Sequence, residues 1–396
     1  MDFELSDDNR MIRDVVQRYV QNELLPLEPM ILRRESEIAG TAQPLVPPDV
    51  EADLQEKARA LGLWGIDLPE EFGGQDLGAL TKLTVIEQLR YSVVPLTLAP
   101  DSPNLHFLKA CCKGGQIERY LIPYGKGEKK SCLALTEPGA GSDIGGMSTR
   151  AERRNGKWIL NGEKIFISHV MSADFMIVIA VTDPDKRQRG GVTAFLVDKN
   201  TPGVTIPSSY PTIAGEYLTF GIHFDNVELD DEQVLGEVGQ AFIPLQNRLG
   251  IRRMEIAAKA LGAARRCLDI MLDHANNRST FGQKLAERQA VQWWIADSHQ
   301  EMEMCRLLAY RLGWRIDRGE TDVRREASMV KLQASEMIGR VADRAVQLLG
   351  GMGLSKESPI EYIYRAYRVQ RIVEGASEIH RWTIARDLLR HGQPAV

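Results

Sequence analysis

Cysteine is scarce in this 396-residue chain, and its five copies form no metal-binding or disulfide pattern. None belongs to a CxxC pair, and no cluster of histidines accompanies them. Disulfide frameworks and structural zinc sites both need such groups, so the sequence argues against both. A reducing, cytoplasmic setting fits this cysteine usage best.

Long apolar runs and a strong charge of one sign are also lacking. No window approaches the roughly 18 uninterrupted apolar residues of a membrane-spanning helix. The N-terminus, MDFELSDDNRMIRDVV, is acidic and amphipathic, unlike a signal peptide. The net charge is −5, with both signs interspersed, so there is no basic stripe for nucleic acid. We therefore expect neither a membrane nor nucleic acid as a partner.

The residues that are present suffice for two or three domains. Apolar residues make up 43% of the chain and charged residues 26%, over a length that exceeds one ordinary core. The pattern changes from helical to β-like near residue 131 and back to helical near residue 239. We predict an α+β fold with an N-terminal helical domain (1–130), a middle antiparallel β domain (131–238) and a C-terminal helical domain (239–396).

Helical periodicity is clearest in the outer thirds of the chain. One helix is predicted over residues 5–32 with Ser6 as its N-cap, followed by helices over 48–61 and 79–92. Three long segments, 241–276, 286–317 and 323–349, follow residue 239. The short breaks between these segments favour antiparallel neighbours in a bundle.

The middle third contains strand and hairpin signals. Asn155-Gly156 and Asn161-Gly162 are both predicted to form hairpin turns, because Asn and Gly tolerate positive φ angles. Alternating apolar residues over 218–224 predict a half-buried strand.

Thr136–Asp143, with the sequence TEPGAGSD, is the first motif that could carry chemistry. A dinucleotide-binding loop would open a helix in a βαβ unit, and hairpin turns follow instead, so that interpretation is rejected. The loop suits hydrogen bonding to a flat polar ring or a phosphate. Its spacing alone favours an ordinary glycine-rich connection.

Two glycine-containing motifs end long helical segments. RSTFG, at 278–282, could bind a phosphate through Arg278 or simply cap a helix. QLLGGMG, at 347–353, could allow close backbone approach or simply stop a helix. In isolation the plain structural interpretation is favoured for each.

RIVEGASE, at 371–378, places one carboxylate after an apolar stretch. Ile372 and Val373 could desolvate Glu374 and raise its pKa toward that of a useful general base. Alternatively, Glu374 ends a helix in water, and alone this is the simpler interpretation. His169 and His380 have no ligand-spaced partners, so we expect no metal site. Ser142 has no matching His and Asp for a hydrolase triad.

Together these motifs resemble the acyl-CoA dehydrogenase family. TEPGAGSD, RSTFG, QLLGGMG and RIVEGASEIHR occur in the family's order, and LPEEFGG and FDNV also match. The resemblance covers essentially the whole chain. It implies a helical domain, a β domain and a C-terminal four-helix bundle, assembled into a homotetramer or homodimer.

The resemblance also implies an activity. Such an enzyme converts an acyl-CoA to the trans-2-enoyl-CoA in fatty acid metabolism, with FAD as cofactor and an electron-transfer flavoprotein as acceptor. Glu374 is implied as the base that removes the α-proton while hydride passes to flavin N5. The alternatives are a flavin oxidase or monooxygenase on the same fold, which commonly lacks the base, and a non-catalytic acyl-CoA-binding protein.

Site residues are implied position by position. Those that would contact FAD are Thr136 and Ser168 at the ring or ribityl chain, Phe166 against the isoalloxazine, and Arg278, Phe281, Gln347 and Gly351 at the pyrophosphate and adenine across a subunit interface. Those on the substrate side are Ser142, Arg253 and Gly375. The chain departs from the family where Phe166 replaces a commoner Trp, Ala376 a Thr, Glu378 a Gln and Ala366 an Asp.

Overall fold

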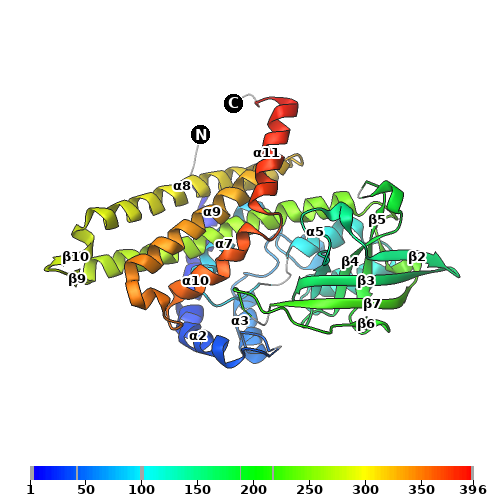
Figure 1. The fold of residues 1–396 in the computed structure, drawn as a ribbon, viewed down its shortest axis with the longest axis horizontal. Coiled ribbons are helices and arrows are strands. Elements are labelled where there is room, and N and C mark those ends of the chain that lie inside the picture. Colours follow the sequence, from blue (N-terminus) through cyan, green and yellow to red (C-terminus); the bar gives the residue numbers. More distant parts are fainter. Residues whose placement is uncertain (1–3, 42, 99–101, 188, 216–217, 394–396) are drawn as a thin grey trace.

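The computed structural model describes residues 4–41, 43–98, 102–187, 189–215 and 218–393. Helices form the first and last parts of the chain, and a sheet lies between them in sequence and at one end of the molecule (Figure 1). The α+β fold expected from the sequence is confirmed. Among the described residues, no helix is both long and apolar enough to cross a membrane.

The N-terminal helices are α1 (Asp7–Tyr19), α2 (Glu28–Glu37), α3 (Pro48–Ala60), α4 (Gly78–Leu89), α5 (Ser102–Cys111) and α6 (Ile122–Gly125). The Ser6 hydroxyl caps α1 by accepting from the Asn9 N–H at 3.2 Å, as predicted. The single helix predicted over 5–32 is wrong, because a π-helical turn and a 3-10 turn separate α1 from α2. Pro26 lies in this break, where it lacks an N–H and its ring crowds the preceding turn.

The sheet comprises β1 (Ser131–Ala134), β2 (Arg150–Arg154), β3 (Lys157–Ser168), β4 (Phe175–Val181), β5 (Val192–Asp198), β6 (Val204–Thr205), β7 (Thr219–Leu229) and β8 (Val234–Leu235). Their order is β6-β7-β3-β2-β4-β5-β8, with β1 paired to β4. The middle domain was predicted to be antiparallel, but its sheet is mixed, because β4 pairs in parallel with β1 and β2. The long connection that contains the β2–β3 hairpin allows the parallel β1–β4 pair.

Of the two predicted Asn-Gly turns, only one is a turn. Asn155-Gly156 joins β2 to β3 with φ angles of 50° and 82°. Asn161-Gly162 instead lies inside β3, where the pairing with β7 is irregular. A Cβ on Gly162 would lie 2.5 Å from the Thr149 hydroxyl oxygen, so this glycine serves close strand approach rather than chain reversal.

The C-terminal helices are α7 (Phe242–Asn277), α8 (Gln289–Asp317), α9 (Arg324–Leu349), α10 (Pro359–Arg368) and α11 (Ser377–His391). A small hairpin, β9 (Ser279–Thr280) and β10 (Gln283–Lys284), joins α7 to α8. The predicted bundle is present: α7, α8 and α9 pack on one another, and α10 and α11 pack on α9. From the N-terminal part, α4 packs on α7 and α8.

Helix α7 connects the two ends of the molecule. Its first turns, with Leu245 and Leu249, pack in the core shared with one face of the sheet. Its middle, from Met254 to Ala275, packs in the core of the bundle and the N-terminal helices. Side chains near the junction of these cores therefore face the sheet, the N-terminal helices and the bundle at once.

Candidate active site

Glu374 lies in the short connection between α10 and α11. Its φ of 56° is left-handed, a conformation that costs a non-glycine residue about 1–3 kcal/mol and persists only where surroundings hold it. Arg253 Nε donates to the Glu374 carbonyl at 3.2 Å, and Lys331 Nζ donates to the Gly375 carbonyl at 2.6 Å. These two cations bind the carbonyls of two successive peptides, Glu374–Gly375 and Gly375–Ala376.

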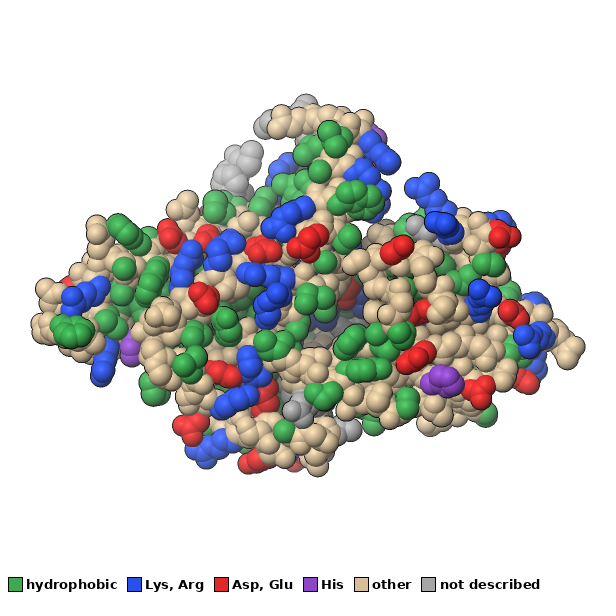
Figure 2. Space-filling view, viewed as in Figure 1, with side chains coloured by type: hydrophobic (Ala, Val, Ile, Leu, Met, Phe, Trp, Pro, Cys, Tyr) green, Lys and Arg blue, Asp and Glu red, His purple; other side chains and the backbone are tan. Residues whose placement is uncertain are grey.

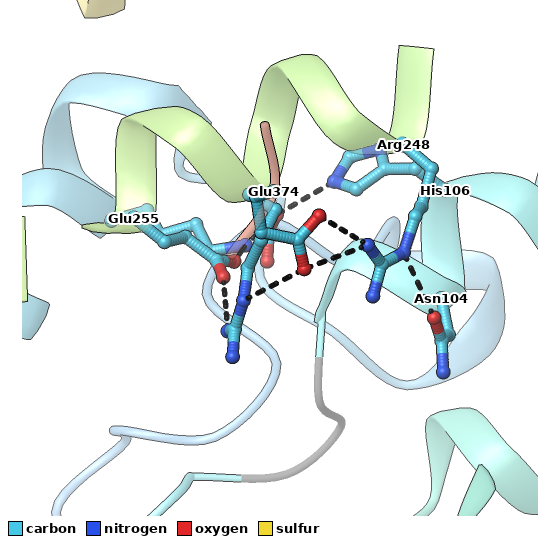
Figure 3. Close-up of polar contacts among 8 residues, drawn as sticks. Asn104, His106, Arg248, Glu255 and Glu374 are labelled. Carbon is cyan, nitrogen blue, oxygen red and sulfur yellow. Dashed lines mark hydrogen bonds and ion pairs between the residues drawn. The ribbon is translucent and has the colours of Figure 1, made fainter. Parts of the chain in front are cut away.

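The Glu374 carboxylate meets arginines of α7. Arg248 Nη1 donates to both carboxylate oxygens, at 3.1 and 3.0 Å, and Arg252 Nε lies 3.9 Å from Oε1 (Figure 3). Arg248 is itself oriented by Asn104 of α5, whose Oδ1 accepts from Nε at 3.2 Å. Arg248 and Arg252 are four residues apart and so share a face of the helix.

The apolar neighbours of Glu374 do not desolvate it. Ile372 is 64% and Val373 44% exposed, whereas the Glu374 side chain is 18% exposed. Burial raises the pKa of Glu374, but Arg248, Arg252 and Arg253 together outweigh this and leave it below its usual value. The expectation of a pKa raised by Ile372 and Val373 is therefore wrong for the protein without substrate.

Beneath this turn lies a buried group of basic side chains. Burial, and then Arg253, lower the pKa of Lys331 to about 8 and that of His380 to about 3. His380 is therefore neutral at pH 7, in keeping with its expected structural role. A Cβ on Gly375 would lie 3.0 Å from His380 Nε2, and its φ is 101°, so glycine is required there.

A cavity of about 70 Å³ lies between α4 and α7, and its lining residue Arg252 connects it to Glu374. Arg252 belongs to both, since it lines the cavity and approaches the Glu374 carboxylate. The charged side chains of the lining are four cations and two anions: Lys82, Arg90, Arg252, Lys259, Asp67 and Glu255. The apolar side chains are Leu63, Ile66, Val85, Ile86, Leu89, Leu96 and Leu98. The cavity thus combines an apolar wall with an excess of positive charge.

Buried ion pairs organise the charged wall of this cavity. Lys82 Nζ lies 2.7 Å from Asp67 and 2.6 Å from Glu255, and Arg252 lies 2.9 Å from Glu255. Burial alone would lower the pKa of Lys82, but Glu255 and Asp67 raise it above its usual value. Lys82 therefore stays charged, and Arg252 is positioned between Glu255 and Glu374.

Three of the residues expected to bind a cofactor lie together in the sheet domain. The Thr136 carbonyl accepts from the Ile165 N–H at 2.9 Å, next to Phe166 and Ser168 at the end of β3. Phe166 is half-exposed at a φ of 54°, and its ring lies 4.8 Å from that of Tyr210. Neither the Thr136 nor the Ser168 hydroxyl bonds to any residue that the structure describes.

The loop from Thr136 to Asp143 is anchored from below. Glu137 and Lys164 form a buried pair at 2.7 Å, and Glu137 also accepts from the Ser148 and Thr149 N–H groups. Ser142 lies exposed on this loop. These interactions of Glu137 hold the glycine-rich loop in one conformation.

The other expected cofactor residues lie elsewhere in the chain. Arg278, Phe281, Gln347 and Gly351 are exposed. Arg278 also forms the cap of α7, as the plain interpretation held, since its N–H donates to the His274 carbonyl. Phe281 is 99% exposed at the tip of the β9–β10 hairpin, at the opposite end of the molecule from the sheet (Figure 1). One chain alone does not bring these residues to Thr136.

The visible face of the molecule is hollowed between its helical part and its sheet part (Figure 2).

Along the chain, three models of acyl-CoA dehydrogenase domains match in succession: the N-terminal domain at residues 6–128, the middle domain at 132–227 and the C-terminal domain at 242–389. The chain belongs to the acyl-CoA dehydrogenase family. It is an oxidoreductase of that family, which is FAD-dependent.

Relatives of this acyl-CoA dehydrogenase include dehydrogenases and reductases. It is 48% identical to (R)-benzylsuccinyl-CoA dehydrogenase of Thauera aromatica, over 99% of this chain and 98% of the relative. It is 32% identical to the caffeyl-CoA reductase-Etf complex subunit CarC of Acetobacterium woodii, over 97% and 99%. A solved structure described as the FAD complex of PigA superimposes with a TM-score of 0.85 at 28% identity, covering 98% and 99%.

Sequence reasoning missed Arg248 and Arg252 of this acyl-CoA dehydrogenase. Their signal was present in the segment RLGIRR, where the two arginines lie four residues apart within a predicted helix. The packing of distant segments decides which way the face of α7 with these two arginines points. The same packing brings Asn104 and Glu374 to that face.

Proposed function

We propose that this acyl-CoA dehydrogenase removes the α-proton of an acyl-CoA through Glu374 and forms the trans-2-enoyl-CoA. The observation that carries the proposal is a mostly buried, ionised carboxylate, held on a strained turn by Arg253 and Lys331. An ionised carboxylate is the form that accepts a proton, and a rigid backbone places it reproducibly. The presence of this base disfavours an oxidase or monooxygenase.

The residues of the sheet domain fit a flavin. A flat ring needs an aromatic wall and hydrogen-bond donors, and these are available in half-exposed Phe166 and in the hydroxyls of Thr136 and Ser168. FAD held by these residues would supply the acceptor for the hydride that leaves the β-carbon. The chain's own part is to hold the acyl group, to exclude water and to take the α-proton on a Glu374 carboxylate oxygen. The Glu374 N–H polarises the thioester carbonyl.

The far end of the cofactor is assigned to a neighbouring subunit. Arg278, Phe281, Gln347 and Gly351 are exposed, and a fully exposed phenylalanine at a hairpin tip supports contact with another molecule. We therefore propose a homotetramer or homodimer in which these residues bind the pyrophosphate and adenine of a partner's FAD. We also propose the domain boundaries at 130/131 and 238/239.

The substrate side is assigned to Ser142, Arg253 and Gly375. Ser142 is exposed on the anchored loop, where it can face the CoA chain. Arg253 donates to the Glu374 carbonyl, and Gly375 leaves room for the His380 ring because it has no Cβ. Both residues therefore help to place the base against the substrate.

For the acyl group we propose an arylalkyl succinyl thioester. The apolar wall of the cavity suits an aryl or alkyl group, and its excess cations suit a free carboxylate. The relative named (R)-benzylsuccinyl-CoA dehydrogenase supports this substrate class. The Etf complex of the caffeyl-CoA reductase relative supports an electron-transfer flavoprotein as acceptor. A cytoplasmic place in acyl-CoA or fatty acid metabolism completes the proposal.

Anaerobic bleaching of the flavin by a panel of acyl-CoA thioesters that includes benzylsuccinyl-CoA tests this function. Wild-type holoenzyme is expected to bleach, whereas Glu374→Gln retains FAD but does not bleach, because an amide cannot accept the proton. Bleaching of Glu374→Gln at the wild-type rate would remove Glu374 from the mechanism. Protein that binds no flavin would support the non-catalytic alternative.

A further inference from the structure

Arg248 donates to the Glu374 carboxylate through only one of its two terminal nitrogens. The residue is 7% exposed, and it meets both carboxylate oxygens through Nη1 alone (Figure 3). Nε is taken by Asn104. Nη2 makes no hydrogen bond to any residue within the described part of the chain. A guanidinium presents paired donors to a carboxylate, and Nη2 is not among the buried side-chain atoms that lack a partner, so this side of Arg248 is accessible to a second anion.

The same pair restrains the proposed base. Arg248 and Arg252 hold negative charge on Glu374, which favours the ionised form but weakens its proton affinity. General-base catalysis is most effective when the base has a proton affinity matched to the operating pH. Loosening of this ion pair on substrate binding would raise the proton affinity of Glu374.

We propose that a free carboxylate on the acyl group, close to the α-carbon as in a succinyl thioester, binds Arg248 and displaces Glu374, which is thereby released to remove the α-proton. This inference rests on the proposed function. It makes Arg248 the residue that selects carboxylated acyl groups and couples their binding to the activity of the base.

Substrate geometry supports this assignment. In a succinyl thioester one methylene group separates the α-carbon from the free carboxyl carbon, so a base that reaches the α-proton also lies beside that carboxylate. Two carboxylates brought together in a buried site repel each other unless a cation lies between them. Arg248 occupies this place, and Arg252 lies next to it at 3.9 Å from Glu374 Oε1.

A neutral acyl group offers nothing that competes for Arg248. It would leave the Arg248–Glu374 pair intact, with the base restrained. The proposal therefore predicts discrimination both in binding and in the α-proton transfer.

Binding of matched thioesters tests the exchange without turnover. Succinyl-CoA and butyryl-CoA have acyl chains of equal length and differ in a terminal carboxylate against a methyl group. Their dissociation constants are measured by isothermal titration of the FAD-loaded protein. Arg248→Gln is expected to weaken succinyl-CoA binding about tenfold or more, in line with the loss of a charged hydrogen bond, and to leave butyryl-CoA binding unchanged.

Glu374→Gln is expected to change the affinity for succinyl-CoA in the opposite direction. It removes the competing carboxylate, so succinyl-CoA is expected to bind severalfold more tightly and butyryl-CoA as in wild type. The matched control, Arg325→Gln, loses a different arginine that is paired to Glu326 and Asp387, and should change neither constant. Equal changes for both thioesters in Arg248→Gln, or no preferential tightening in Glu374→Gln, overturn the proposal. If Arg248→Gln does not fold, Glu374→Gln alone decides.

The pH profile of anaerobic bleaching provides a second readout. The groups that face Glu374 are Arg248, Arg252 and Arg253 of α7, Lys331 of α9 and His380 of α11. With a carboxylated substrate the acid limb of the wild-type profile should lie at higher pH than with a neutral one, and Arg248→Gln should abolish this difference. Coincident wild-type limbs contradict the exchange. If no acyl-CoA bleaches wild-type protein, the proposed dehydrogenation fails, whereas the binding contrast is still measured separately.

Discussion

Replacement of Lys331 by Met separates what this residue does for stability from what it does for the site. Lys331 is fully buried in α9, and its ammonium group donates to the Gly375 carbonyl at 2.6 Å. Burial and Arg253 lower its pKa from 10.5 to about 8. At about 1.4 kcal/mol per pKa unit, the folded protein disfavours the charged form by roughly 3 kcal/mol.

The sign of the pH dependence follows from proton binding. Between pH 8 and 10.5 the unfolded chain keeps the Lys331 proton and the folded protein has lost it. The unfolded state then binds more protons, so this residue makes stability rise with pH across that window. Below pH 8 both states are protonated, and the full penalty applies.

At pH 7, Lys331→Met removes that penalty of roughly 3 kcal/mol but leaves the Gly375 carbonyl without its donor, which costs about 1–3 kcal/mol. The two effects nearly cancel, so we expect unfolding free energies within about 2 kcal/mol of wild type. From pH 8 to 10.5 the variant should fall behind wild type by roughly 3 kcal/mol, since it lacks the gain. Bleaching should slow by about 10- to 100-fold, because the turn that carries Glu374 is released.

Urea unfolding of the FAD-loaded protein at pH 7, 8, 9 and 10 measures the first two quantities, and anaerobic bleaching measures the third. If the difference in unfolding free energy between wild type and Lys331→Met does not change with pH, the lowered pKa of Lys331 is refuted. Wild-type bleaching in Lys331→Met would show that its contact with Gly375 does not place the base.

Three further substitutions test other parts of the structure. Gly375→Ala places a Cβ 3.0 Å from His380 Nε2 at a φ of 101°. It should slow flavin bleaching by a larger factor than its loss of unfolding free energy accounts for. Bleaching rates and urea unfolding of the same variant check this. Lys164→Met leaves Glu137 buried without its cation and should lower stability by about 3–5 kcal/mol in urea unfolding; a loss under 1 kcal/mol contradicts the pair's structural role. Phe281→Ala removes a 99% exposed side chain and should leave the unfolding of each subunit unchanged, but should weaken FAD retention and oligomerisation on gel filtration. Unaltered retention would remove Phe281 from the proposed cofactor site.

Local patterns predicted the helices well and the sheet less well. The segments 241–276, 286–317 and 323–349 correspond closely to α7, α8 and α9, because helical periodicity depends on residues a few positions apart. Asn161-Gly162 has the composition of a turn, yet it lies within β3, where Thr149, the residue before β2, lies against Gly162. The parallel pairs of β4 are likewise set by long-range contacts that no local pattern contains.

The sequence by itself determined the α–β–α order of the chain, the family through four ordered motifs, and Glu374 as the candidate base. These features depend on residue type and spacing, which can be read along one dimension. Only the tertiary structure decided the electrostatic state of Glu374. It brought Arg248 and Arg252 of α7, Asn104 of α5 and Lys331 of α9 to one turn, and it exposed the neighbours that were expected to desolvate it. Charge–charge interactions act through space, so segments more than 100 residues apart set the pKa of this carboxylate.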